Sequence, residues 1–356
     1  MYSLLAWLTW NPVREAFIVP ILDRPVTWYG ILFASGVAFC YIMLIYIFKI
    51  QIWRKGNISK IWIKNWPKFL AQFNDDPSFS NTDDRVEIIK TLNHYLENPN
   101  HSTSRKERFE KLHKKFPQTL MTPYEASFYL IDRLLWYGIL GTLIGARLGH
   151  VFFYDLARYM QNPMEIFMVW NGGVASHGAA IGILLAIYLF YLRYRDSLPG
   201  KGYFAFLDLF IIPIPIAGVC IRLGNFFNQE ILGTPSTLPW AVIFANPIDG
   251  RSVVPRHPVM LYEAAACIAI FFILFSLWKT RGSYLRAGFL SGLFFTLIFG
   301  ARFILEFFKV LQTNVVIIEG IRMGQILSVP FILLGLILIW RSTRVSGRRV
   351  CADTKP

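Results

Sequence analysis

The stretch PVMLYEAAACIAIFFILFSLW, residues 258–278, decides what kind of fold this chain can have. Its only charged residue, Glu263, stands near its start, and apolar side chains dominate the rest. An α-helix rises about 1.5 Å per residue, so roughly 20 apolar residues cross the hydrocarbon core of a bilayer. The stretch therefore predicts a transmembrane helix.

Six further apolar runs of similar length lie elsewhere in the 356 residues, namely 28–48, 128–154, 174–192, 203–221, 287–308 and 323–340. The composition agrees, because 54% of the residues are hydrophobic and only 16% are charged, against about 25% charged in soluble domains. We therefore predict an all-α membrane protein, a bundle of seven transmembrane helices. The bilayer is the expected environment and no nucleic acid is an expected partner.

The basic residues predict the orientation of the bundle, because cytoplasmic loops retain lysine and arginine. With the N-terminus outside (periplasmic) and the C-terminus cytoplasmic, the inside segments hold 26 of the 36 basic residues. Three short inside segments contribute 11 of these, so the long first loop alone does not decide the count. We therefore expect an odd number of crossings with the C-terminus inside.

The polar stretches divide the chain into four expected parts. These are 1–48 (an N-terminal interfacial helix over MYSLLAWLTW and the first transmembrane helix), 49–126 (a basic cytoplasmic insertion), 127–345 (a catalytic transmembrane core with a periplasmic segment, 222–257) and 346–356 (a cytoplasmic tail). Within the insertion, RKERFEKLHKK from Arg105 predicts a charged surface helix. The insertion is expected to be a solvated segment touching anionic headgroups, with a docking module as the alternative.

Polar residues gather at one depth of the predicted bundle. Ionisable groups within a membrane are costly unless they face a cavity or a partner, so each is a functional candidate. On the predicted topology the outer ends of five or six helices carry Tyr29, Arg147, His177, Arg222, Asn225, His257, Tyr262, Glu263, Arg302 and Glu306. This is the depth of an outer-leaflet headgroup. Because guanidinium groups suit phosphate, the pattern indicates a phospholipid site.

Several of these residues also have a purely structural interpretation. Arg302 and Glu306 are four residues apart on one helix face, which predicts a buried ion pair, or a glutamate that orients Arg302 toward phosphate. Arg147 in GARLGH is more often a paired structural residue, and we favour that role. His177 in VASHGAAIG fits a packing histidine and a functional one about equally.

Common catalytic and metal motifs do not occur in the sequence. It has neither G-x-S-x-G nor H-E-x-x-H, and its four cysteines, at 40, 220, 267 and 351, are scattered. We therefore expect no metal and no cofactor. The nucleophile must then come from a second substrate.

A series of motifs resembles the prolipoprotein diacylglyceryl transferase family. In order along the chain these are WYG (28–30), GARLGHVFFY (145–154), SHGAAIG (176–182), RLGNFFNQEILG (222–233), PRHPVMLYE (255–263), ARFILEFF (301–308) and MGQILSVP (323–330). Each motif alone is weak, but the ordered series covers nearly the whole predicted membrane part and leaves out 49–126.

The resemblance implies an activity. Members transfer the diacylglyceryl group of phosphatidylglycerol to the thiol of the lipobox cysteine in a prolipoprotein signal peptide, in the bacterial inner membrane. By resemblance, the catalytic residues are His177, Arg222 and Arg302, with His177 as the candidate base for the thiol. The phosphatidylglycerol-binding residues are Tyr29, Arg222, Asn225, Glu230, Gly233, Arg302 and Glu306. Asp208 matches an acidic position of the family and is expected to be structural.

Three features depart from the family pattern. The family's H-G-G is H-G-A here, Ile298 stands where a tyrosine is usual, and the 49–126 insertion has no counterpart. The alternative function is a lipid transporter or flippase, which should show internal repeats and polar groups at the bilayer midplane. A metal-dependent lipid-linked transferase would need outward paired carboxylates, which are absent from the sequence.

Overall fold

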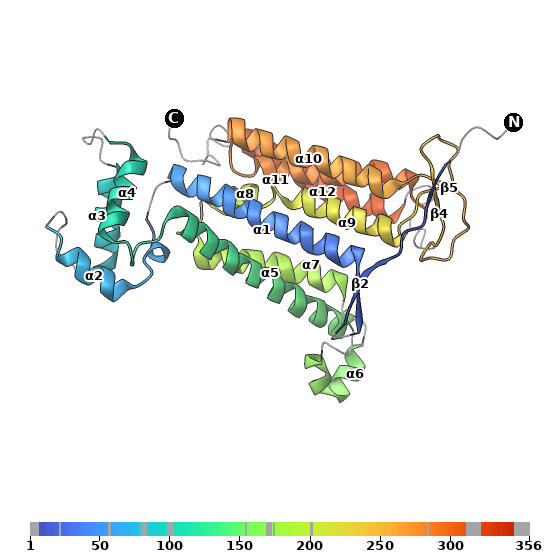
Figure 1. The fold of residues 1–356 in the computed structure, drawn as a ribbon, viewed down its shortest axis with the longest axis horizontal. Helices are drawn as coiled ribbons and strands as arrows, with labels where there is room; N and C mark the ends of the chain where they lie inside the picture. Colours follow the sequence, from blue (N-terminus) through green and yellow to red (C-terminus); the bar gives the residue numbers. More distant parts are fainter. Residues whose placement is uncertain are drawn as a thin grey trace. The chain divides into compact units, whose positions relative to one another are not determined.

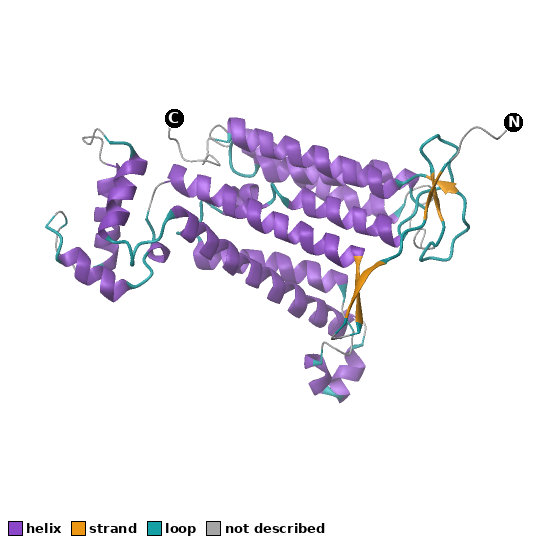
Figure 2. Ribbon diagram, in the orientation of Figure 1, coloured by secondary structure: helices purple, strands orange, loops and turns teal. Residues whose placement is uncertain are grey.

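The computed structural model describes residues 7–20, 23–55, 58–77, 79, 84–97, 103–153, 155–168, 173, 175–199, 202–282, 285–310 and 322–344. The chain forms two compact units, one of Met1–Leu44 with Leu207–Pro356 and the other of Ile45–Phe206. Both consist mainly of helices, as Figure 2 shows in purple. The prediction of a mainly helical membrane protein is therefore confirmed.

Five helical segments of the described chain are long and apolar enough to cross a membrane, namely Trp28–Ile52, Pro123–Phe152, Val259–Arg281, Phe289–Phe308 and Gly324–Arg344. A sixth candidate is a pair of helices, α8 (Tyr203–Phe210) and α9 (Ile214–Asn228), bent by 41°. The bend falls beside Pro213, whose missing N–H cannot continue a helix. The described part thus has five or six candidate spans.

The remaining predicted span, 174–192, coincides with helix α7 (Ser176–Tyr194). Its described apolar part, Gly178–Tyr194, is shorter than the other candidates. The seven-span count and the orientation of the termini therefore remain predictions.

In the first unit, four helices pack in sequence order (Figure 1). They are α9, α10 (Val259–Arg281), α11 (Phe289–Leu305) and α12 (Met323–Arg344), and each lies beside the next. Small residues allow α11 and α12 to approach closely. A Cβ on Gly292 would lie 2.7 Å from the carbonyl oxygen of Gly335. Such small-residue contacts are how helices associate in lipid.

Asp208 fastens α8 to the start of α11. Its carboxylate accepts hydrogen bonds from Gly288 N (2.7 Å), Ser291 N (2.7 Å) and Ser291 Oγ (2.6 Å). The first N–H groups of a helix have no partner within the helix, and an acidic group there also suits the helix dipole. This fully buried residue is therefore structural, as expected.

In the second unit, α7 packs along α5 (Pro123–Phe153) through facing glycines. A Cβ on Gly145 would lie 2.4 Å from the carbonyl oxygen of Gly178, and one on Gly141 would lie 2.7 Å from that of Gly182. The connection between α5 and α7 contains α6 (Leu156–Gln161) and the 3-10 helix η2 (Pro163–Phe167). The helix α1 (Trp28–Lys55) runs from the first unit into the second.

The insertion of the second unit has a core of its own. It contains the 3-10 helix η1 (Lys60–Trp62) and the helices α2 (Trp66–Asn74), α3 (Arg85–Glu97) and α4 (Arg105–Lys115). Apolar side chains are buried within it, among them Phe69, Phe73, Ile88, Leu92, Phe109 and Phe116. The predicted charged helix is confirmed as α4, which begins with a capping box formed by Ser104 and Glu107.

Short strands occur in the first unit, where only helix was expected. A sheet contains β1 (Leu8–Trp10), β4 (Val242–Phe244) and β5 (Pro255–Arg256), with β1 parallel to β4. A separate hairpin pairs β2 (Glu15–Val19) with β3 (Arg24–Thr27). The prediction of an interfacial helix over the N-terminal stretch is wrong over Leu8–Trp10.

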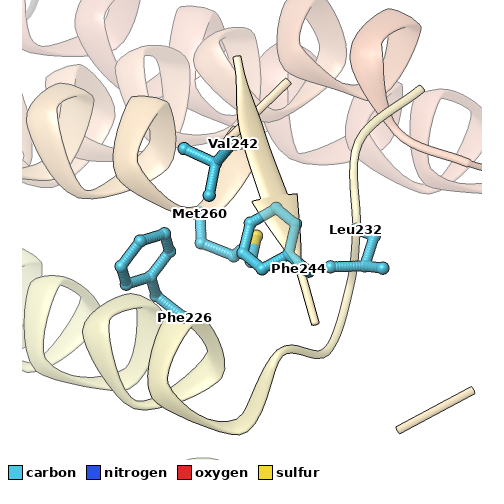
Figure 3. Packing of buried hydrophobic residues seen from close by; sticks show 5 residues of the cluster. All are labelled: Phe226, Leu232, Val242, Phe244 and Met260. Carbon is cyan, nitrogen blue, oxygen red and sulfur yellow. The ribbon is translucent and has the colours of Figure 1, made fainter. Parts of the chain in front are cut away.

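A buried cluster explains why β1 forms. Figure 3 shows Phe226, Leu232, Val242, Phe244 and Met260 packed together. Trp10 packs against this cluster, and its indole nitrogen donates to Phe226 O at 3.0 Å. Contacts with residues more than 200 positions away thus override the local apolar pattern, as is common for strands.

Candidate active site

Arg222 lies in the last two turns of α9 and is held on two sides. Its Nε lies 3.0 Å from Glu263 Oε2 at the start of α10, and its Nη1 donates to Asn225 Oδ1 at 3.2 Å. The side chain is 22% exposed. No described residue accepts a hydrogen bond from Nη2, so this nitrogen can donate to a ligand.

The residues after Arg222 fold back on it. Asn225 Nδ2 donates to Glu230 Oε1 at 2.7 Å, and Asn228 Nδ2 reaches the same oxygen at 3.4 Å. The chain turns at Gln229, which adopts the left-handed conformation with φ 54° and ends α9. The turn returns Glu230 to Asn225, which explains the spacing of arginine, asparagine and glutamate in RLGNFFNQE.

Lys309 joins two carboxylates beside Arg222. Its Nζ lies 2.7 Å from Glu263 Oε1 and 3.5 Å from Glu306 Oε2. Lys309 and Glu263 are only 5% and 7% exposed as side chains. A continuous series of charges therefore runs from Arg222 through Glu263 and Lys309 to Glu306.

The predicted ion pair between Arg302 and Glu306 is wrong. After Leu305 the α-helix α11 tightens into the 3-10 helix η4 (Glu306–Phe308). In a 3-10 helix residues three apart stand one above the other, so Glu306 faces Lys309 and not Arg302. Arg302 is exposed, and it makes no ion pair or side-chain hydrogen bond with any residue that the structure describes.

Two backbone contacts define the space around Glu306. A Cβ on Gly324, at the start of α12, would lie 2.5 Å from Glu306 Cδ, so the carboxylate rests directly on the glycine. Arg322 donates through Nη1 to the carbonyl oxygens of Glu306 and Lys309. The start of α12 therefore holds the end of α11 in place.

Tyr29 packs against the same helix as Arg222. A Cβ on Gly224 would lie 2.7 Å from Tyr29 Cδ2, so the ring lies flat on this glycine. Gly224 stands two residues after Arg222 on α9, so the partly exposed Tyr29 lies against the same helix as Arg222 but on a different face of it. The geometry at Arg222 is that of an anion site, with a half-buried guanidinium backed by the carboxylate of Glu263.

Comparison with known proteins bears on what such a site does. The sequence model described as prolipoprotein diacylglyceryl transferase matches residues 113–341. A relative from Protochlamydia amoebophila, named phosphatidylglycerol–prolipoprotein diacylglyceryl transferase, is 41% identical over 357 residues, covering 95% of each chain. The chain belongs to the prolipoprotein diacylglyceryl transferase family.

Two relatives that match a smaller share of the chain carry the same name. The one from Tolumonas auensis is 44% identical over 218 residues, covering 61% of this chain and 81% of its own. The one from Chloroherpeton thalassium is 44% identical over 215 residues, covering 60% and 77%. The family model begins at residue 113, so most of the helical insertion lies outside the part that defines the family.

Gly233 is the last residue of the motif that begins at Arg222. At this residue the backbone lies close to two other segments of the chain. It pairs with Lys309 in an isolated bridge, and its carbonyl oxygen accepts from Arg256 Nη1 at 3.2 Å. A Cβ there would lie 2.2 Å from His257 O. Gly233 therefore lets the chain after α9 approach Lys309.

Ile298, which replaces the usual family tyrosine, lies in an apolar environment. It packs against Val219, Ala264 and Cys267 on α9 and α10. An aliphatic side chain suits this cluster, because a buried hydroxyl would need a hydrogen-bond partner there.

His177 is the second residue of α7, in the second unit. Its side chain lies outside the described part of the structure, so its meeting with the arginines of the first unit stays a prediction. Among the described residues, no group of three or more metal-ligating side chains comes together.

Arg147, in the second unit, is bound by backbone. It donates through Nε to Ile166 O (2.8 Å), through Nη1 to Gly173 O (3.0 Å), and through Nη2 to Glu165 O and to Met168 O (3.3 Å). Tyr159 lies against its guanidinium at 5.0 Å. The favoured structural role for Arg147 agrees with these contacts.

Lys309 is not among the site residues predicted from the sequence. A lysine just after an apolar run is expected to end a membrane span and to face solvent. Its spacing of three from Glu306 was the only available signal. The sequence does not predict that Glu306–Phe308 form a 3-10 helix, and it is this geometry that brings Glu306 and Lys309 into contact.

Proposed function

We propose that this protein transfers the diacylglyceryl group of phosphatidylglycerol to the thiol of the lipobox cysteine of prolipoproteins. The product is a thioether, and glycerol phosphate is released. The name of the Protochlamydia amoebophila relative supports the proposal, because it describes a diacylglyceryl transfer between phosphatidylglycerol and a prolipoprotein. The structural observation that carries the proposal is Arg222, held from behind by Glu263 and Asn225 with Nη2 available for phosphate.

The residues suit the chemistry of this transfer. The substrate thiolate attacks the carbon of the diacylglyceryl unit that bears the phosphate. The bond between this carbon and the phosphate oxygen breaks, and its electron pair leaves with the oxygen of glycerol phosphate. Arg222 and the exposed Arg302 stabilise the charge that develops on the leaving group, which is electrostatic catalysis. Tyr29 contacts the headgroup, and Asn225 and Glu230 hold Arg222 in place. Gly233 and Glu306 line the site through their contacts with Lys309.

The thiol must lose its proton during the transfer. A free cysteine thiol has a pKa near 8.5, so a base or a positive field raises its reactivity at neutral pH. His177 is the base in this proposal. The two arginines supply the positive field that favours the thiolate.

The proposed arrangement in the membrane follows from the substrates. The chain crosses the bacterial inner membrane seven times with its N-terminus periplasmic and its C-terminus cytoplasmic. Residues 127–345 form the catalytic part with a periplasmic segment at 222–257, while 1–48, the cytoplasmic insertion 49–126 and the tail 346–356 surround it. Because both substrates are embedded in the bilayer, they enter the site sideways from the outer leaflet.

The test is transfer of labelled diacylglycerol from phosphatidylglycerol to a lipobox peptide by the purified full-length protein. We expect wild-type protein to label the cysteine. Arg222→Ala and Arg302→Ala should each lose at least about a hundredfold in kcat/KM, as expected for removal of a charge-stabilising donor. Arg344→Ala is the matched control, because Arg344 is an exposed residue at the far end of α12.

Two outcomes decide against the proposal. Wild-type protein that leaves the thiol unlabelled but moves lipid between leaflets would be a transporter. Folded arginine variants with full activity would refute the phosphate role of these residues. His177→Ala, assayed across pH, then tests the base: its loss should shrink as rising pH ionises the thiol.

A further inference from the structure

Lys309 is a buried cation whose contacts are not those of a span-ending lysine. Its ammonium lies between Glu263 and Glu306, at 2.7 and 3.5 Å. Its backbone pairs with Gly233, and its carbonyl oxygen accepts from Arg322. Four separate segments of the first unit therefore meet at one residue.

The charges around Lys309 nearly balance. Glu263 has one oxygen toward Arg222 and the other toward Lys309. The buried Glu263 and the partly buried Glu306 thus share two cations, and Glu306 lies against Gly324. Without Lys309, both carboxylates would depend on Arg222 or stay unneutralised, which is costly in a poorly solvated place.

This balance determines what Arg222 can offer a ligand. An arginine that neutralises two carboxylates by itself has little net positive field left for a phosphate. Because Lys309 takes up the second negative charge, Glu263 orients Arg222 through Nε and leaves its positive field for the ligand. The effect acts over several ångströms and needs no contact between Lys309 and substrate.

We propose that Lys309 is a positioning residue that neutralises Glu263 and Glu306, so that Arg222 presents its charge to an anionic phospholipid headgroup. The inference rests on the proposed function, since the headgroup must be that of the transfer donor. It predicts that Lys309 controls affinity for the anionic donor more than the rate of the chemical step. Neither Arg222 nor Arg302 needs to move for this effect.

The experiment measures KM for phosphatidylglycerol, and inhibition by free glycerol phosphate, in full-length Lys309→Met. Neither KM nor the inhibition constant depends on the fraction of enzyme that is folded. A loss of stability alone would therefore leave both unchanged. Removal of one charge near the site should raise KM and the inhibition constant on the order of tenfold. Lys309→Arg should stay within about threefold of wild type, and Lys279→Met, an exposed lysine on α10, should be unchanged.

The double variant Glu263→Gln with Lys309→Met is the sharpest test. It removes both charges of one pair, and the amide oxygen can still accept from Arg222. We expect KM to return to within about threefold of the wild-type value. Coupling of this kind is what a double-mutant cycle measures.

The outcomes for the two proposals differ. Active wild type with an unchanged KM in Lys309→Met, or a double variant no better than the single one, overturns the role of Lys309 and leaves the proposed function standing. Wild-type protein without any transfer refutes the proposed function itself. If Lys309→Met fails to fold, Lys309→Gln, which removes the charge but keeps a hydrogen-bond donor, takes its place. The same rise in KM is then expected, and an unchanged KM overturns the role of Lys309.

Discussion

Two arginines of this chain stand in the same tripeptide, Arg-Leu-Gly, yet their surroundings differ. Arg147 donates to four carbonyl oxygens of the connection after α5 and is nearly fully buried. Arg222 contacts one carboxylate and one amide, and it remains 22% exposed. Four of the five N–H donors of the first arginine bond to backbone, whereas the second retains a donor for a ligand.

The difference teaches that the partner type indicates the role of an arginine better than its motif does. Carbonyl oxygens carry no net charge. Several of them bonded to one arginine hold the folded shape of the connection, which is therefore lost when the arginine is replaced. A carboxylate orients the guanidinium and, when a second cation shares it, leaves positive charge in place. Arg147 is therefore expected to govern stability and Arg222 to govern activity.

The largest expected effect comes from replacing each arginine by lysine. A lysine keeps the charge but cannot reproduce the planar fork. Arg222→Lys should lower kcat/KM about a hundredfold with little change in melting temperature. Arg147→Lys should leave carbonyl oxygens unsatisfied at about 1–3 kcal/mol each, lowering the melting temperature while activity per folded molecule stays within about twofold. The reverse pattern in paired melting and kinetic measurements would break the comparison.

A smaller effect is expected at two glycines, one beside Arg147 and one beside Glu306. Gly173 has φ 73° and a Cβ there would lie 2.8 Å from Arg147 Nη1, so Gly173→Ala should destabilise by about 1–3 kcal/mol. In Gly324→Ala the new Cβ displaces the Glu306 carboxylate and should raise KM about tenfold. Equal kinetic effects at the two positions would argue that both clusters serve catalysis.

The smallest effect separates the two asparagines beside Arg222. Asn225 joins Arg222 to Glu230 with bonds of 3.2 and 2.7 Å, whereas Asn228 makes one long bond of 3.4 Å. A long bond of this kind is weak. We expect Asn225→Ala to lower kcat/KM about tenfold and Asn228→Ala less than twofold. An equal loss in the two variants would mean that Glu230, and not Arg222, is the important partner.

Much of the helical arrangement was predictable because apolar length is a strong signal in a membrane protein. Each of the seven predicted runs coincides with a helix or a bent pair of helices in the described chain. The Arg222 motif was equally visible, since its members lie close together along the chain. Local spacing was sufficient wherever the contact itself is local.

The predictions failed where distant residues decide. Leu8–Trp10 form a strand because Val242–Phe244 lie beside them, and no local pattern shows that partner. Glu306 meets Lys309 because the last turn of α11 tightens, a change of about one residue in register. Such changes depend on packing against the following helix, which spacing along the sequence does not encode.

The parallel pairing of β1 with β4 has a consequence for how the chain is made. Leu8 pairs with Val242, so one of the first segments to be synthesised has to wait for a partner that emerges more than two hundred residues later. At about 5–20 residues per second, the wait is roughly ten to fifty seconds. During that time the N-terminal segment has an unpaired edge, and a bulky tag fused close to it would obstruct this pairing.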